Sequence, residues 1–205
     1  MASGRLAHQA RPLKRSFYER DTQVVAFELV GKVLTLDQRG AVLSAKIVET
    51  EAYLGADDPA SHAYHGVTPR NQVMFGPAGF SYVYFTYGNH HCLNIVTERK
   101  DIPGAVLIRA VEPITGISMM RKRRGQVEDR ELTNGPGKLT QAFRITREHS
   151  GIDLTEGPFY VAEGTGNGPL DITATTRIGI SSAQEFPFRF YLNTSPFVSK
   201  RQVLR

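Results

Sequence analysis

The sequence predicts an α+β fold: a single compact domain with a mostly antiparallel, curved β-sheet, β-hairpins and a few surrounding helices. Three observations support this prediction. Neighbouring strand-like segments are joined by short turn sequences, as in hairpins. The helix-like segments do not alternate with strands, as they would in βαβ units. No Ser/Gly/Pro-rich linker or internal repeat divides the 205 residues. A chain of this length buries about 70% of the surface that its unfolded form exposes, enough to support an irregular active site without disulfides.

The N-terminal elements are expected to be one short helix followed by a hairpin. Asp21 is suited to cap the helix, because its carboxylate can accept hydrogen bonds from the free amides of the first turn, and Gly31 ends it. A strand over residues 32–36 then turns at residues 37–40 into a second strand that ends at Glu51.

The remaining elements follow from apolar runs and turn residues. A second hairpin is expected around residues 88–90, with Tyr87 at or beside its tip. The other predicted elements are hairpin strands 80–87 and 91–97, a strand over 106–110, helices 117–124 and 136–143, and strands 159–162 and 189–192.

The charge of the chain indicates a polyanionic partner. Lysine and arginine number 25 against 20 aspartates and glutamates, and the pI is about 9.4. Residues 1–15 carry basic side chains and no acidic one, so they are expected to form a disordered basic arm ahead of a folded domain at residues 16–205. A second basic block is a candidate for contacts with phosphates: Arg121, Lys122, Arg123 and Arg124.

The single cysteine and the length of the apolar runs limit the cellular setting. Cys92 has no partner for an internal disulfide, and its apolar strand context predicts a core position rather than a nucleophile. A reducing compartment is therefore expected, the cytoplasm or nucleoid of a bacterium or the nucleus of a eukaryote. No segment approaches 18 apolar residues, so no membrane span is expected.

Two glutamates stand in a strand-like segment, residues 47–53, where acidic residues are uncommon. Because side chains alternate across a strand, Glu49, Glu51 and Tyr53 share one face. A buried carboxylate without a partner is costly, so this placement needs a reason. On the strand alone two interpretations stay open: glutamates paired with arginines on a solvated face, or acids of an active site.

Further motifs decide between these interpretations. They are Val48-Glu49-Thr50-Glu51-Ala52-Tyr53, the downstream His62, Tyr82-Val83-Tyr84-Phe85-Thr86-Tyr87-Gly88, Cys92-Leu93-Asn94, and the segments 107–113, 135–139, 177–180 and 189–191. In this order, from about residue 16 onward, the chain resembles the alkyladenine (3-methyladenine) DNA glycosylase family.

The resemblance implies a base-excision-repair enzyme. Its substrate would be double-stranded DNA in which a damaged purine, such as 3-methyladenine, 7-methylguanine, hypoxanthine or ethenoadenine, is flipped out and cut from its sugar. Glu51 matches the family glutamate that holds the attacking water, and Arg109 matches the arginine that helps to orient it. An adjacent guanidinium also favours the ionised carboxylate that a base requires. Glu49 is expected to be structural.

The resemblance also assigns the base pocket and the DNA contacts. Tyr53, His62 and Tyr84 match the pocket walls, and Asn94 matches the asparagine at the pocket floor, although an asparagine in a strand is about as often bonded to backbone. Tyr87 matches the side chain that intercalates where the nucleotide has left. Contacts with the DNA backbone are expected from the basic side chains Arg70, Lys138, Arg121, Lys122, Arg123 and Arg124.

No cofactor or metal is implied, and a monomer is expected. None of the motif residues is a lysine that could form a Schiff base with the sugar, so the abasic site should be left without strand cleavage.

Two other classes of protein fit parts of the sequence. A metal-dependent hydrolase could use His62, His65, His90 and His91, with Asp57 and Asp58 nearby, but the usual metal-binding signatures are missing. A non-catalytic nucleic-acid-binding protein would explain the charge and the aromatic residues while leaving the Glu51–Arg109 pair without a task. His90-His91 and the short loop at residues 62–68 also depart from the family pattern.

Overall fold

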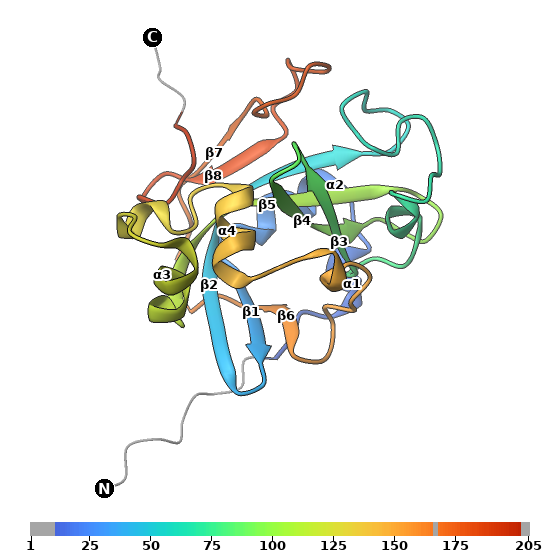
Figure 1. Ribbon diagram of the computed structural model, residues 1–205. Coiled ribbons are helices and arrows are strands. Elements are labelled where there is room, and N and C mark those ends of the chain that lie inside the picture. The colour runs from blue at the N-terminus through green and yellow to red at the C-terminus, as the bar shows by residue number, and fades with distance from the viewer. Residues whose placement is uncertain (1–10, 166–167, 202–205) are drawn as a thin grey trace, which may run out of the picture.

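The computed structural model describes residues 11–165 and 168–201, which form a strongly curved antiparallel sheet with helices packed on it (Figure 1). Within these residues the sheet has eight strands. They are β1 (Val33–Gln38), β2 (Ala41–Leu54), β3 (Ser81–Thr86), β4 (His90–Thr97), β5 (Gly104–Thr115), β6 (Phe159–Ala162), β7 (Ile172–Thr175) and β8 (Arg189–Leu192). The helices are α1 (Arg15–Tyr18), α2 (Thr22–Leu29), α3 (Ile117–Arg124) and α4 (Pro136–Phe143), with 3₁₀ turns η1 (Gln72–Phe75), η2 (Asp129–Glu131) and η3 (Arg147–His149).

The long strand β2 organises the sheet. Its main path runs β3-β4-β5-β2-β1-β6, and every pair is antiparallel. On one edge β2 pairs with β5 along most of its length. On its other edge residues 41–46 pair with β1, and residues 49–51 pair with β8, which also pairs with β7. The segment that carries both glutamates is therefore bonded to strands on both sides.

The helices cover the two faces of this sheet, with α4 in front of it and α2 behind in Figure 1. The Asp21 carboxylate caps α2 by accepting hydrogen bonds from the amides of Gln23 and Val24 at 2.9 and 3.0 Å. Buried side chains of α2 pack against β2, and Thr50 on that face donates to the Ala26 carbonyl at 2.8 Å. Because Thr50 faces α2, its neighbours Glu49 and Glu51 face the other side of the sheet.

Most of the predicted elements are confirmed. The α+β class, the two hairpins and the capped helix are present, and the ranges of α3, α4, β6 and β8 agree with the predicted ones. The predicted strand over 106–110 is longer, because β5 spans twelve residues. The helix α1 and the strand β7 were not predicted, and both are only four residues long.

Residues 11–15 of the predicted basic arm are folded against the domain. Pro12 forms a β-bridge with Ala162, Leu13 is buried, and Arg15 begins α1 and pairs with Asp153. Packing of an apolar side chain and an ion pair place residues 11–15 in the domain. The remainder of the proposed arm, residues 1–10, lies outside the described residues.

Candidate active site

Two fully buried carboxylates lie side by side on the inner face of β2. Glu49 and Glu51 each have no exposed side-chain surface, and the Arg109 guanidinium of β5 reaches both. Its Nε donates to Glu49 at 3.1 Å and its Nη1 to Glu51 at 3.2 Å. The predicted sharing of one face by the two glutamates is thus confirmed, and neither is solvated.

Glu51 accepts hydrogen bonds at both oxygens. The backbone amide of Ile178 donates to Oε1 at 2.8 Å, and the Tyr53 hydroxyl donates to Oε2 at 2.8 Å beside Arg109. Each of these three donor residues also lines the adjacent cavity, whereas Glu51 itself has no exposed surface. The carboxylate therefore lies one layer behind the cavity wall.

Glu49 has a different set of partners, which the sequence did not reveal. Its Oε1 accepts from Arg109, from Arg189 of β8 at 2.7 Å and from the Ser199 hydroxyl at 2.8 Å. Its Oε2 accepts from the Ser199 amide at 2.6 Å. Two guanidinium groups thus balance the two carboxylates, which is what makes their burial tolerable.

Burial changes the ionisation expected for Glu51. Desolvation raises the pKa of its carboxyl and outweighs the opposing effects of Arg109, the Ile178 amide and the Tyr53 hydroxyl, while the Glu49 charge raises the pKa further. Arg109 alone would favour the ionised form, as expected from the sequence, but burial of the carboxyl has the larger effect on its pKa. Burial and the neighbouring Glu51 also raise the pKa of Tyr53, so its hydroxyl keeps its proton.

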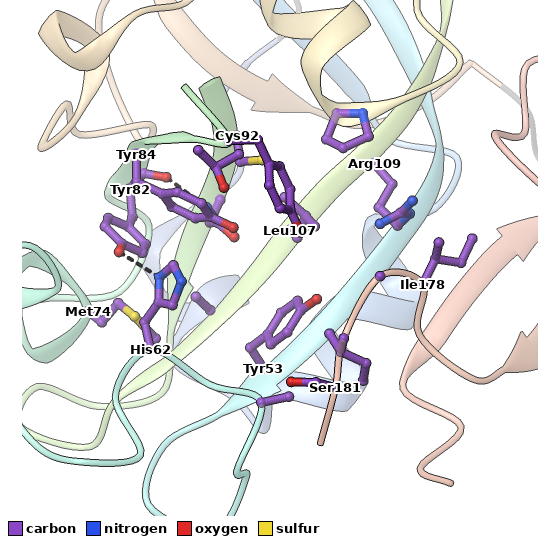
Figure 2. Close-up of a pocket in the computed structure, with 18 of the residues that line it drawn as sticks. Tyr53, His62, Met74, Tyr82, Tyr84, Cys92, Leu107, Arg109, Ile178 and Ser181 are labelled. Atoms are coloured by element: carbon purple, nitrogen blue, oxygen red, sulfur yellow. Dashed lines mark hydrogen bonds between the residues drawn. The ribbon is translucent and has the colours of Figure 1, made fainter. Parts of the chain in front are cut away.

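An aromatic cavity of about 410 Å³ opens beside this cluster. Figure 2 shows His62, Tyr82 and Tyr84 on one side, Ile178 and Ser181 on the other, and Tyr53 between them. The predicted base-pocket residues Tyr53, His62, Tyr84 and Asn94 all line it. The wall also includes residues that were not predicted from the sequence to form a base pocket, namely Met74, Tyr82, Cys92, Leu107, Pro136 and residues 178–182.

His62 stands at the exposed mouth of the cavity as a neutral side chain. Its Nδ1 is 2.9 Å from the Tyr82 hydroxyl, and its ring meets the Tyr84 ring edge-on with centroids 4.5 Å apart. Desolvation against these rings, and then the nearby Arg70 charge, lower the pKa of His62 to about 4. At neutral pH the imidazole is therefore an uncharged aromatic surface.

Asn94 is bonded to the backbone and also lines the cavity. Its Nδ2 donates to the Tyr82 backbone carbonyl at 3.0 Å, and the residue, 4% exposed, still lines the cavity. The backbone bond fixes the amide in the cavity wall.

Tyr87 lies at the tip of the β3–β4 hairpin, as predicted. It is 79% exposed and has a left-handed backbone, φ +50°, followed by Gly88 at φ +70°. An L-residue adopts this conformation rarely, and here it completes a tight turn. The turn holds a large aromatic ring in solvent at the rim of the cavity, next to His90.

The basic side chains proposed for DNA contacts differ in their surroundings. Arg70 is exposed, with its guanidinium 5.0 Å from the centre of the Tyr84 ring. Lys138 donates to Asn134 at 2.8 Å and Lys122 is exposed on α3. The rest of the α3 block is bonded within the protein: Arg121 pairs with Asp129, Arg123 bonds to Gln38 and Ala142, and Arg124 bonds to Gln141. Helix α4 lies between this block and the hairpin that carries Tyr87 (Figure 1).

The four histidines of the metal-site alternative are engaged separately. His62 bonds to Tyr82, His65 packs on Tyr64, His90 bonds to Asn89 and His91 packs on Phe85. Among residues 11–165 and 168–201, no three His, Cys, Asp or Glu side chains are grouped as metal ligands.

In the same part of the chain, no helix is long and apolar enough to cross a membrane.

Comparisons with known proteins agree with this geometry. Residues 16–196 match the family described as "Methylpurine-DNA glycosylase (MPG)". A protein of Carboxydothermus hydrogenoformans is 49% identical over 92% of this chain and 99% of its own length, and one of Methanoculleus marisnigri is 47% identical over the same shares. A Rhodopseudomonas palustris protein is 49% identical over 92% of this chain and 88% of its own. All three are described as "Putative 3-methyladenine DNA glycosylase". The chain belongs to the methylpurine-DNA glycosylase family, DNA-repair hydrolases that cleave the N-glycosyl bonds of alkylated bases in DNA.

Proposed function

We propose that this protein flips a damaged purine out of duplex DNA into the aromatic cavity and hydrolyses its N-glycosidic bond with a water activated by Glu51. The observation that supports the proposal most is the position of Glu51. It is a buried carboxylate at the end of an aromatic cavity, held by three donors that all line that cavity.

The cavity suits a flat aromatic base. His62 and Tyr84 offer one aromatic surface, and the Tyr53 ring, which lies between them and Ile178, offers a second (Figure 2). A base inside a duplex cannot reach Glu51, so the nucleotide must leave the stack. The exposed ring of Tyr87 is placed to fill the gap and to offset part of the lost stacking.

Glu51 has two tasks in this proposal. As a general base it takes a proton from the attacking water, and as an anion it stabilises the positive charge that develops on the sugar. Burial strengthens the second effect because little solvent screens the charge. Since Tyr53, Arg109 and Ile178 cover the carboxylate completely in the free protein, we infer that one of these groups moves when the water and substrate bind.

The leaving group sets the range of substrates. Alkylpurines that carry a positive charge, 3-methyladenine and 7-methylguanine, depart as neutral bases and need no general acid. Hypoxanthine and ethenoadenine are harder leaving groups and should be cut more slowly. Of the described residues that line the cavity, none is a lysine, so hydrolysis without strand cleavage is expected.

The test is release of free base from duplexes that each hold one defined lesion, with alkali added afterwards to reveal abasic sites. Wild-type protein should release alkylpurines and cut the strand only after alkali. Glu51→Gln should lower the single-turnover rate by about 10² to 10⁴ while lesion binding remains. EDTA in the assay should change nothing.

Glu49→Gln is the matched control for Glu51→Gln. It makes the same carboxylate-to-amide change two residues away. The change falls on the partner of Arg189 and Ser199 instead of on the proposed base. It should lower the melting temperature and leave excision per folded molecule much closer to wild type. Greater damage to the chemistry by Glu49→Gln, or activity lost in EDTA and restored by zinc, would contradict the assignment.

A further inference from the structure

Asp58 and Arg177 form a second buried ion pair, outside the Glu49–Glu51–Arg109 cluster. Neither side chain has exposed surface, and the pairing is bidentate: Nη1 donates to Oδ2 at 2.6 Å and Nη2 to Oδ1 at 2.8 Å. A buried ion pair is weak evidence for a role in stability, because desolvation offsets much of the attraction. Its position in the molecule is more informative.

The pair joins the segments that surround the cavity. Asp58 accepts from the amides of Leu54, at the end of β2, and Ala60, in the loop that leads to His62, both at 3.1 Å. Arg177 donates to the Ala52 carbonyl at 2.9 Å. One ion pair thereby fixes the end of β2, the loop after it and the segment that begins at residue 177.

Arg177 also adjoins two of the three groups that cover Glu51. Its guanidinium carbon is 4.8 Å from the centre of the Tyr53 ring, whose hydroxyl donates to Glu51. The residue after it, Ile178, provides the amide that donates to the other oxygen of Glu51. Because Arg177 is anchored at three acceptor atoms, the adjoining peptide group has little freedom to turn away.

We propose that the Asp58–Arg177 pair positions the reaction machinery, by holding the Ile178 amide and the Tyr53 ring against Glu51. This inference rests on the proposed role of Glu51 as the base. Neither residue touches the cavity in the described structure, so both act through their neighbours. The pair thereby sets the orientation of the carboxylate and how readily it ionises.

The protonation of Glu51 gives a readout that a purely structural role would not move. The Ile178 amide and the Tyr53 hydroxyl both lower the pKa of Glu51 against the effect of burial. Loosening the pair should weaken both bonds and raise that pKa. The other charged or titratable groups around Glu51 stay in place: Glu49 on β2, Cys92 on β4, Arg109 on β5 and, through Glu49, Arg189 on β8.

The experiment compares Arg177→Lys and Asp58→Asn with wild type in single-turnover excision of 7-methylguanine at saturating protein, from pH 4.5 to 9. Lysine keeps the charge but cannot make the forked pair or the flat contact with Tyr53. Both variants should lower the rate constant by about 10- to 100-fold and move the acid limb of the pH profile upward, with lesion-DNA affinity within about threefold of wild type.

Arg15→Lys is the matched control, because Arg15 also makes an ion pair, with Asp153, and a backbone bond to Ala78, yet it touches none of the cavity residues. It should change the melting temperature but neither the rate nor the pH profile. A wild-type rate and acid limb in folded Arg177→Lys and Asp58→Asn would overturn the proposal, as would failure of both variants to fold. Glu51→Gln in the same assay separates the two hypotheses: if it remains active, the role of Glu51 is wrong as well.

Discussion

The two glutamates of β2 have different surroundings, which supports the different roles proposed for them. Glu49 is held by Arg109, Arg189 and Ser199. Of these three residues, only Arg109 borders the cavity. Glu51 is held only by groups that border it. A change in the cavity can reach Glu51 through three bonded neighbours but Glu49 only through Arg109, in keeping with the proposed roles of base and structural acid.

The raised pKa of Glu51 predicts a pH dependence. A general base works when deprotonated, so the excision rate should fall about tenfold for each pH unit below the pKa of Glu51. Burial raises this pKa above the ordinary 4.5, so the fall should begin at a higher pH than for a solvated glutamate. Single-turnover excision of 7-methylguanine measures it, because this base stays positively charged throughout the acidic range in which the fall is expected.

Two variants test the origin of this acid limb. Tyr53→Phe removes a hydrogen bond that lowers the pKa of Glu51, so the limb should move further upward. His62→Gln should leave it in place, because the pKa of His62 is lowered to about 4 and the imidazole stays neutral across the range. If the acid limb disappears in His62→Gln, the limb reports titration of the imidazole instead of Glu51.

The sequence located the side chains of the candidate site better than its backbone groups. Glu51, Arg109 and the three aromatic walls could be recognised because each is distinctive in its motif. The amide of Ile178 could not, since every residue except proline has one and its direction depends on the fold. The partners of Glu49 were missed for a related reason: Arg189 and Ser199 lie 140 and 150 positions along the chain.

At the scale of elements, the β3–β4 hairpin serves two surfaces at once. Its strand residues Tyr82 and Tyr84 lie in the cavity wall with ring centroids 5.4 Å apart, whereas Tyr87 at the turn points into solvent. The left-handed backbone at Tyr87 and Gly88 turns the chain, so that the Tyr87 ring points away from the cavity wall that Tyr82 and Tyr84 form. One short element thus carries both part of the aromatic cavity wall and the proposed intercalating ring.

Tyr87→Ala should reduce excision by weakening nucleotide flipping. Loss of a base–aromatic stack costs roughly 1–3 kcal/mol, which lowers the flipped population by about 5- to 150-fold. The penalty should be large for hypoxanthine in a stable pair and small in mismatched or single-stranded DNA, where extrusion costs less. Single-turnover excision on the paired and mismatched duplexes measures the difference.

Tyr87→Phe serves as the control, because it keeps the ring and should keep most of the rate. Thermal melts should be nearly unchanged in both variants, since the side chain is 79% exposed. An equal loss of rate on all substrates, or a collapse in melting temperature, would make Tyr87 an ordinary pocket or core residue.

Local patterns predicted the elements but not all of their pairings. The α4 range followed from Gly135-Pro136 at its start and its apolar spacing, and the β1–β2 hairpin from its turn residues. The pairing of residues 49–51 with β8 has no local signal, because it depends on which strands the curved sheet brings together. The four-residue strand β7 is too short to show a period.

For the whole molecule, the excess of five basic residues predicts DNA binding that depends strongly on salt. Each phosphate contact should contribute about 0.9 to the slope of log affinity against log salt concentration. Arg70→Ala should reduce the slope by about this amount, since Arg70 is exposed beside Tyr84. Lys122→Ala and Lys138→Ala test one other exposed cation and one half-buried cation. Titrations of undamaged and lesion duplexes at several salt concentrations measure it.

Arg121→Ala provides the comparison, since Arg121 pairs with Asp129 and α4 lies between its helix and the hairpin. Its slope should stay near that of wild type. A slope reduced by Arg121→Ala and unchanged by Arg70→Ala would move the DNA-binding face to α3.

The partners of Glu49 impose an order of events on the newly made protein. Both carboxylates of β2 leave the ribosome long before Arg189 and Ser199, which later surround Glu49. Until β8 adds to the edge of β2, one acid of the pair lacks most of its donors, and burying it is unfavourable. The site therefore closes late in folding, through contacts between distant parts of the chain, which are slow to form. A chain still in synthesis therefore carries the Glu49–Glu51 motif before it has the residues that complete the cluster.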